Sequence, residues 1–175
     1  LLLDYKKLSG LYIHIPFCRK ACNYCDFHFS TQLDSMDRMV DGLAKELRLR
    51  GSTPKSPIDT IYFGGGTPSL VSVKIVEKII SRLHEQSLLA DDCEVSFELN
   101  PKEVTKDYLD ALVNIGINRF SVGIQSFSSN TLASLERNHN SKESIDAVEL
   151  VSSMKHADTT IDLIYGVMEQ DLSSL

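Results

Sequence analysis

The hydrophobic residues of this sequence follow two alternating patterns, which predict strands and helices in regular succession. Alternation of apolar and polar positions predicts five short strands, at residues 11–17, 59–63, 94–99, 119–126 and 160–165. Between them, apolar residues recur every three or four positions and predict helices at about 35–50, 72–85, 105–116 and 141–154, with a helical turn at 129–136. Residues 168–175 are expected to form a turn and the start of another helix.

Strands that alternate with helices are typical of an α/β fold with a parallel sheet, because parallel neighbours need a long crossover connection. About five βα units are expected, fewer than the eight that close a TIM barrel. Thr105 is expected to cap the third helix and Gly116 to end it. The predicted architecture is a partial TIM-type (βα) barrel.

The two faces of the predicted strands differ in polarity, which indicates where a site would lie. The face expected under the helices carries Ile13, Ile15, Val95, Phe97, Leu99, Phe120, Val122, Ile124, Ile161 and Leu163. The opposite face carries Tyr12, His14, Ser96, Glu98, Ser121, Gly123, Gln125 and Asp162, which are polar or small. Glu98 and Gln125 lie near the carboxyl ends of their strands, where such folds place their sites. The alternative is that these side chains are simply solvated strand ends.

Composition and charge narrow the class of protein. The 175 residues are 42% hydrophobic with a net charge of −6, which fits one soluble domain with a real core. An acidic chain is not expected to bind nucleic acid, since phosphate contacts need clustered Lys and Arg. No apolar run approaches the ~20 residues of a membrane span, and the first three leucines are too few for a signal peptide. Reduced thiols without a targeting segment favour a cytoplasmic location.

Three of the four cysteines, Cys18, Cys22 and Cys25, fall within eight residues with the spacing C-x3-C-x2-C. Clustered thiols in a chain otherwise poor in cysteine indicate metal binding or redox chemistry. A four-iron cluster held by three thiolates would keep one iron open for a ligand. Two alternatives remain, a zinc site completed by His14 or His28 and three thiols without a function. A disulfide framework is not expected, because Cys93 is distant and the chain is not a small cysteine-dense domain.

The cysteines lie within the segment 12–27, YIHIPFCRKACNYCDF, which resembles the cluster motif of radical S-adenosylmethionine (SAM) proteins. More narrowly, it resembles the HemN/HemW family of oxygen-independent coproporphyrinogen III oxidases and related heme chaperones. Four further motifs follow in the family's order: FGGGTPSL at 63–70, FELNP at 97–101, SVGIQSF at 121–127 and DLIYG at 162–166. Five ordered motifs are far more specific than the cysteine spacing alone.

The resemblance implies a [4Fe–4S] cluster on Cys18, Cys22 and Cys25, with SAM bound at the open iron. It also implies a set of SAM-binding residues: Tyr12, Tyr24, Gly65, Gly66, Thr67, Glu98, Gln125, Arg137 and Asp162. Glycines at a strand end suit this role independently, because they allow the backbone to approach a ligand closely. The role of His14 is left open. Arg19 and Lys20 either offset the negative charge of the cluster or are solvated, and solvation is favoured. Cys93 is expected to be a buried thiol.

The resemblance further implies a six-stranded partial barrel, of which this chain holds about five βα units. On that basis residues 1–175 are expected to be the N-terminal fragment of a radical SAM core domain. The C-terminal part of the barrel and a C-terminal domain would then be absent, and strand five would have an exposed edge. Any heme-binding residues would lie beyond residue 175, so neither heme nor substrate ligands are assigned and catalytic residues are unknown.

Two functions from different classes remain, and a third is less favoured. The first is a heme chaperone that binds heme and delivers it to accepting proteins. The second is an oxidase that decarboxylates coproporphyrinogen III, with an electron donor as partner. The oxidase group carries a further cysteine two positions after the third, where this chain has Phe27, and a longer N-terminal extension, so the chaperone is favoured. The third is a truncated cluster- and SAM-binding module without turnover.

Overall fold

The computed structural model describes residues 8–50, 56–86 and 88–167, so the turn and helix start expected at 168–175 lie outside the described residues. Five strands form one parallel sheet in the order β1-β2-β3-β4-β5: β1 (Gly10–Ile15), β2 (Ile58–Gly65), β3 (Leu89–Leu99), β4 (Arg119–Gln125) and β5 (Asp158–Leu163). The helices are α1 (Met36–Arg50), α2 (Val73–Glu85), α3 (Lys106–Asn114), α4 (Ser129–Ser134) and α5 (Ser141–Ser152). Short 3-10 turns lie at η1 (Leu33–Ser35), η2 (Pro68–Leu70) and η3 (Pro101–Glu103).

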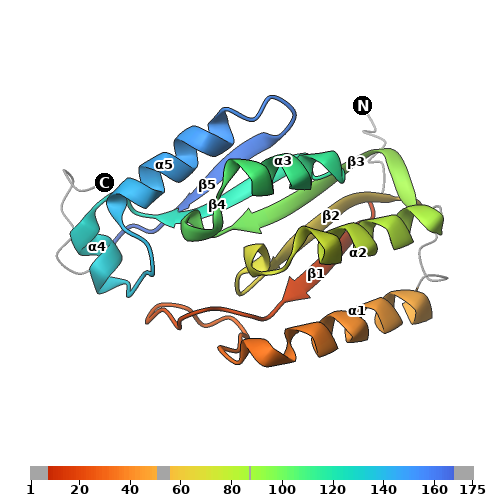
Figure 1. Cartoon of the computed structure of the whole chain (residues 1–175), viewed down its shortest axis with the longest axis horizontal. Helices are drawn as coiled ribbons and strands as arrows, with labels where there is room; N and C mark the ends of the chain where they lie inside the picture. The colour runs from red at the N-terminus through yellow and green to blue at the C-terminus, as the bar shows by residue number, and fades with distance from the viewer. Residues whose placement is uncertain (1–7, 51–55, 87, 168–175) are drawn as a thin grey trace, which may run out of the picture.

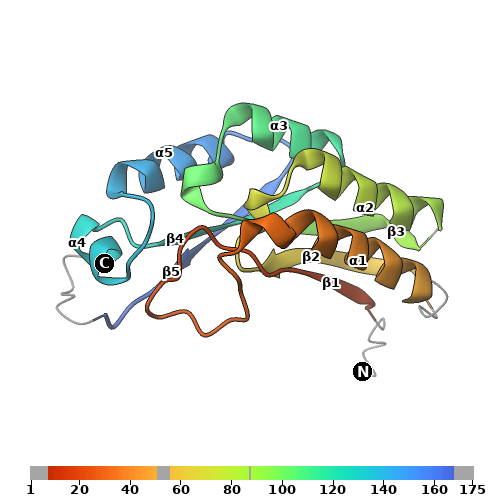
Figure 2. The ribbon, with the colours of Figure 1, turned by 60° about the horizontal axis from the view of Figure 1, so that its bottom comes forward.

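The molecule has two layers (Figures 1 and 2). Helices α1, α2, α3 and α5 cover one face of the sheet, and the opposite face is left open. A strand order that follows the chain, with a helix between successive strands, is the arrangement of a (βα) barrel that has not closed. This confirms the predicted α/β class and is consistent with a partial barrel. Among the described residues, no helix combines the length and apolar composition needed to cross a membrane.

The core lies between the sheet and its helices, on the face for which the strand pattern predicts apolar residues. Phe63, Phe97 and Phe120 on neighbouring strands are fully buried, and the rings of Phe63 and Phe97 lie 5.5 Å apart. Truncating one such phenylalanine to alanine costs about 3–5 kcal/mol. The opposite face is wetter, and Tyr12 there is 57% exposed.

Local signals for the helix ends are confirmed in detail. The Thr105 side chain accepts a hydrogen bond from the Tyr108 amide at 3.3 Å, which satisfies an orphan donor of the first turn of α3. Gly116 follows that helix with φ +100°, a conformation that favours glycine. The helix expected from residue 141 begins with a capping box between Asn140 and Glu143.

The structure differs from the sequence prediction at two strands. β3 begins at Leu89 and not at residue 94, because Leu89 pairs with Ile58 across a register shift that no alternating pattern marks. Ile161 and Leu163 were expected under helices but are 37% and 50% exposed. They lie on the edge strand β5, after which no helix follows among the described residues.

Candidate functional site

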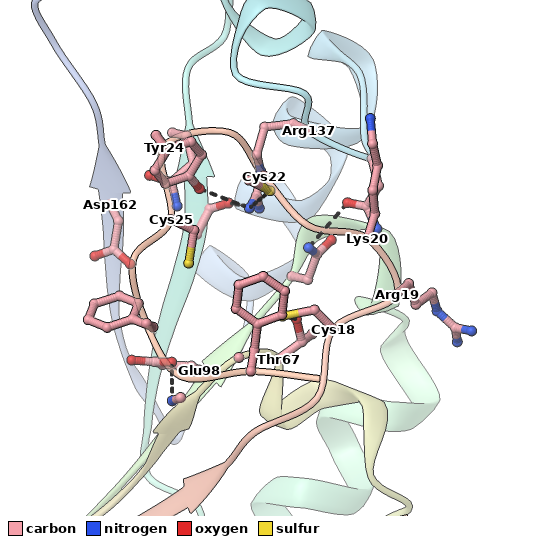
Figure 3. A pocket seen from close by; sticks show the side chains of 18 of the residues that line it. Cys18, Arg19, Lys20, Cys22, Tyr24, Cys25, Thr67, Glu98, Arg137 and Asp162 are labelled. Atoms are coloured by element: carbon pink, nitrogen blue, oxygen red, sulfur yellow. Dashed lines mark hydrogen bonds between the residues drawn. The ribbon is translucent and has the colours of Figure 1, made fainter. Parts of the chain in front are cut away.

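A pocket of about 370 Å³ opens at the carboxyl ends of the strands (Figure 3). Every strand supplies it with a side chain or a following loop, because parallel strands all end at the same edge of the sheet. The lining includes, in chain order, Cys18, Cys22, Tyr24, Cys25, Gly65, Gly66, Thr67, Glu98, Gln125, Arg137 and Asp162. Of the residues proposed from the sequence, Tyr12 is the one that lies outside this lining.

The cysteines lie on a loop after β1 whose two ends are tied together. The Cys18 amide donates to the Ser30 carbonyl at 3.0 Å, and the Ser30 amide donates to the Pro16 carbonyl at 2.7 Å. The three thiols therefore project from a closed loop over the strand ends. Burial is the largest influence on the Cys18 thiol and raises its pKa, which the hydroxyl of Thr67 opposes by donating to its Sγ at 3.6 Å.

The part of this loop that carries residues 19–23 is also bound to segments that follow β3 and β4. Asn23 Nδ2 donates to the Ser134 carbonyl at 2.6 Å, Arg19 pairs with Glu103 at 2.7 Å, and Lys20 pairs with Glu136 at 3.9 Å. Arg19 and Lys20 are thus solvated, as expected, and each also has an ion-pair partner. Both side chains remain about half exposed, so each ion pair contributes at most about 1 kcal/mol.

Gly65 and Gly66, at the end of β2, bring backbone directly against β1 and the cysteine loop. A Cβ on Gly66 would lie 2.9 Å from Cys18 Sγ and 2.7 Å from the Phe17 carbonyl oxygen. Gly65 has φ +125°, and a Cβ there would meet the His14 ring at 2.8 Å. The pocket wall at this point has room for backbone alone.

Two carboxylates line the opposite part of the pocket. Glu98 accepts hydrogen bonds from the Tyr62 hydroxyl at 2.7 Å and from the Gly65 amide at 3.2 Å, while burial raises the pKa of its carboxyl. Asp162 accepts from the Ser121 hydroxyl at 3.4 Å. Neither carboxylate forms an ion pair with a described lysine or arginine, so both suit a cationic or hydroxyl-bearing ligand.

Arg137 links the cysteine loop to β4. Its Nη2 donates to the Gly123 carbonyl at 2.8 Å, and its Nη1 lies 3.1 Å from the Tyr24 hydroxyl and 3.8 Å from Cys22 Sγ. The next pocket residue along β4 is Gln125, whose backbone has φ +68°. Residues other than glycine rarely adopt this conformation. Such strain is found where the surrounding structure enforces it, often at functional sites.

Tyr12 and His14 lie on β1, outside the lining of the pocket. The Tyr12 hydroxyl lies 2.9 Å from His14 Nδ1, and His14 Nε2 lies 3.0 Å from the His28 carbonyl. Because a carbonyl only accepts, Nε2 carries the proton and anchors the cysteine loop. Cys93 lies within β3, where it is only partly buried. Asn23, Glu103 and Tyr62 were not found from the sequence, since nothing in their spacing signals contacts to distant segments.

An open parallel β/α sheet with three cysteines on its first loop and glycines on the next defines the class of protein. A family model described as the Radical SAM superfamily matches residues 12–175. The chain belongs to the radical SAM superfamily, and its relatives there include heme chaperones and an oxygen-independent coproporphyrinogen III oxidase.

The heme chaperone HemW of Buchnera aphidicola subsp. Acyrthosiphon pisum (strain APS) is 36% identical over 167 residues, covering 93% of this chain and 44% of the relative. The oxygen-independent coproporphyrinogen III oxidase of Synechocystis sp. (strain ATCC 27184 / PCC 6803 / Kazusa) is 31% identical over 98% of this chain and 38% of the relative. The solved structure of coproporphyrinogen III oxidase (HemN) from Escherichia coli matches with a TM-score of 0.86 and 29% identity, over 95% of this chain and 39% of that one. The chain thus spans less than half the length of these relatives.

The superfamily implies a [4Fe–4S] cluster and SAM, and the donor set of the pocket fits both. Three cysteines, and no fourth, are in the lining of the pocket. Because Gly66 has no side chain, the space beside Cys18 Sγ stays free. Among the described residues, no three His, Cys, Asp or Glu side chains are grouped to hold a single metal ion. A four-iron cluster does not require such a group, because each thiolate ligates a different iron.

Proposed function

We propose that Cys18, Cys22 and Cys25 ligate the cluster and that SAM lies between the cluster, the glycine segment and the two carboxylates. The observation that supports this is the convergence of all of these groups on one pocket. Bound there, a cluster reduced by one electron and SAM would together supply radical chemistry. The chain's own residues would position them.

Each group in the pocket suits one part of SAM. Glu98 offers acceptor oxygens to the ammonium, and Gly65 and Gly66 offer close backbone contact to the methionine part. Asp162 and Gln125 suit ribose hydroxyls, and Arg137 suits the carboxylate. Tyr24 closes the pocket at the loop, where its hydroxyl partners Arg137. Tyr12 acts on SAM only through its neighbours, since it lies outside the lining.

Replacing Thr67 with valine is expected to make the midpoint potential of the cluster more negative. Thr67 donates a hydrogen bond to Cys18 Sγ, and a donor to a thiolate ligand stabilises the reduced, more negative cluster. Valine keeps the volume and removes the donor, whereas Thr67→Ser keeps the donor as the matched control. The measurement is a redox titration of the reconstituted protein followed by EPR. An unchanged potential in Thr67→Val would contradict a bond to the ligand sulfur.

For the biological role we propose a heme chaperone, a protein that binds heme and delivers it to accepting proteins. The single observation that supports this is Phe27, which occupies the position where the oxidase group carries its additional cysteine. Phe27 is 72% exposed at the rim of the pocket and has no chemistry to offer a radical reaction. Several of the relatives are named heme chaperones, the HemW of Buchnera among them. Reduced thiols favour the cytoplasm as the location.

The chaperone role predicts that the whole protein binds heme and transfers it, without consuming coproporphyrinogen III. Heme binding is measured by absorbance titration, and transfer by the spectrum of a heme-accepting apoprotein. Release of carbon dioxide from coproporphyrinogen III is measured anaerobically with SAM and a reductant, beside a known oxygen-independent oxidase as positive control.

Decarboxylation at the rate of that control would support the oxidase alternative, which is the activity named for the structurally similar HemN. A protein that loads the cluster and binds SAM but neither transfers heme nor decarboxylates would be a module without turnover. The same protein preparation therefore distinguishes a heme chaperone, an oxidase and a module without turnover.

A further inference from the structure

The end of β4 departs from regular pairing just where it reaches the pocket. Pairing with β3 ends at Val122, and the register with β5 shifts between Val122 and Gln125. Inside this shift lie Gly123 and Ile124, and immediately after it Gln125 adopts φ +68°. This irregular segment, Val122–Gln125, is called the β4 bulge below. The direction of the Gln125 side chain, which lines the pocket, depends on what holds the bulge in place.

Side chains of the loop between α4 and α5 hold it. Arg137 Nη2 donates to the Gly123 carbonyl at 2.8 Å, and His139 Nε2 lies 3.1 Å from the Ile124 carbonyl. The carbonyls of Gly123 and Ile124 thus each accept a hydrogen bond from a side chain of the same short loop. The carbonyl is only an acceptor, so His139 must carry its proton on Nε2.

His139 has no role in the chemistry assigned to the pocket and does not line it. It is 5% exposed, and its Nδ1 is buried without a hydrogen-bond partner. Burial, reinforced by the nearby Arg137 charge, lowers the pKa of the imidazole to about 4. The ring is therefore neutral near pH 7, with one nitrogen donating and the other left unsatisfied. An apolar side chain would avoid that unsatisfied acceptor, so the donated bond is what the imidazole contributes.

We infer that His139 is a positioning residue, whose Nε2–H donor holds the β4 bulge and thereby aims Gln125 and Arg137 into the pocket. Loss of the donor frees the Ile124 carbonyl, and the strained Gln125 relaxes toward an ordinary conformation. Arg137 sits two residues before His139 on the same loop, so it also loses its fixed distance to Cys22 and Tyr24. The inference rests on the SAM site proposed above, so the consequence falls on the binding of SAM and is independent of whether the protein transfers heme.

Two substitutions distinguish the effect of the His139 hydrogen-bond donor from the effect of the volume of its ring. His139→Gln keeps a donor near the position of Nε2 and loses the ring, whereas His139→Phe keeps the ring and loses the donor. A donor role predicts that the glutamine variant binds SAM within about threefold of the parent and that the phenylalanine variant binds it at least about tenfold more weakly. SAM affinity is measured by equilibrium dialysis on protein whose iron and sulfide contents match the parent.

Tyr108→Phe is the control for a general loss of stability. It removes the bond from the Tyr108 hydroxyl to the Val71 carbonyl, on α3 and away from the pocket lining. It is expected to lower the melting temperature without weakening SAM binding. Equal SAM affinity in His139→Phe and the parent, or a loss in His139→Gln as large as in His139→Phe, would overturn the inference and leave His139 as a residue that fills space.

A measurement on the unmodified protein keeps the inference testable should the phenylalanine variant not fold. Long-range ¹⁵N–¹H spectra distinguish the two neutral tautomers of histidine and the charged ring. We expect His139 as the neutral Nε2–H form at pH 7, identified by the signal missing from His139→Gln. A proton on Nδ1, or a charged ring at that pH, is incompatible with the role.

Discussion

Replacing Cys22 with alanine is expected to abolish the iron–sulfur cluster, whereas Cys93→Ala is expected to leave it intact. Cys22 lies in the pocket beside Cys18 and Cys25, and two remaining thiolates cannot hold three irons of a cubane. Cys93 lies outside the pocket lining, where its thiol donates to the Glu94 carbonyl. Iron and sulfide are measured after anaerobic reconstitution, together with EPR of the reduced protein with and without SAM.

The expected parent signal is that of a reduced [4Fe–4S] cluster that SAM perturbs. A full cluster in Cys22→Ala would show that the ligand set is wrong, and its loss in Cys93→Ala would implicate the fourth cysteine. A folded protein that takes up no cluster but binds one zinc tightly would favour the zinc site completed by His14 or His28.

Gly66→Ala is expected to lose both stability and the cluster, although it adds a single methyl group. Its Cβ would lie 2.9 Å from Cys18 Sγ and 2.7 Å from the Phe17 carbonyl, and the Gly66 amide is already bonded to the Ile15 carbonyl at 2.9 Å. Overpacking of this kind costs about 1–3 kcal/mol in free energy of unfolding. Any relief must move Cys18, so the cluster is affected beyond the loss of stability.

The matched control is Gly42→Ala, in the interior of α1. A Cβ at Gly42 has nothing within 4 Å, and alanine in a helix interior stabilises by about 0.5–1 kcal/mol relative to glycine. Thermal unfolding of the cluster-free proteins and iron content after reconstitution are compared. If the two alanine variants unfold alike and load equal iron, the glycine segment does not press on the cysteine loop as the structure indicates.

The alternation of strands and helices could be predicted from the sequence because its causes are local. Apolar side chains must repeat every second residue to cover one face of a strand and every three or four to cover one side of a helix. The cap at Thr105 and the helix end at Gly116 follow from the chemistry of neighbouring residues. The cysteine spacing and the ordered motifs likewise lie in short continuous segments, which is why the superfamily could be identified from them.

The inward and outward sets of β1, β3 and β4 were also predictable, since parity along a strand decides them. The same rule did not predict the exposure of Ile161 and Leu163. Parity states which face a residue is on, whereas only the arrangement of neighbouring elements decides whether that face is covered.

Contacts across the carboxyl ends of the strands were decided by the tertiary structure alone. Arg19 and Glu103 are separated by 84 positions, Asn23 and Ser134 by 111, and Arg137 and Cys22 by 115. No periodicity spans such distances, because the parallel sheet brings these segments together only once its register is set. The same holds for the bulge in β4, the conformation of Gln125 and the position of Tyr12 outside the pocket lining. The sequence by itself determined the elements and the class of chemistry, and the packing of the sheet decided which side chains meet and how they are held.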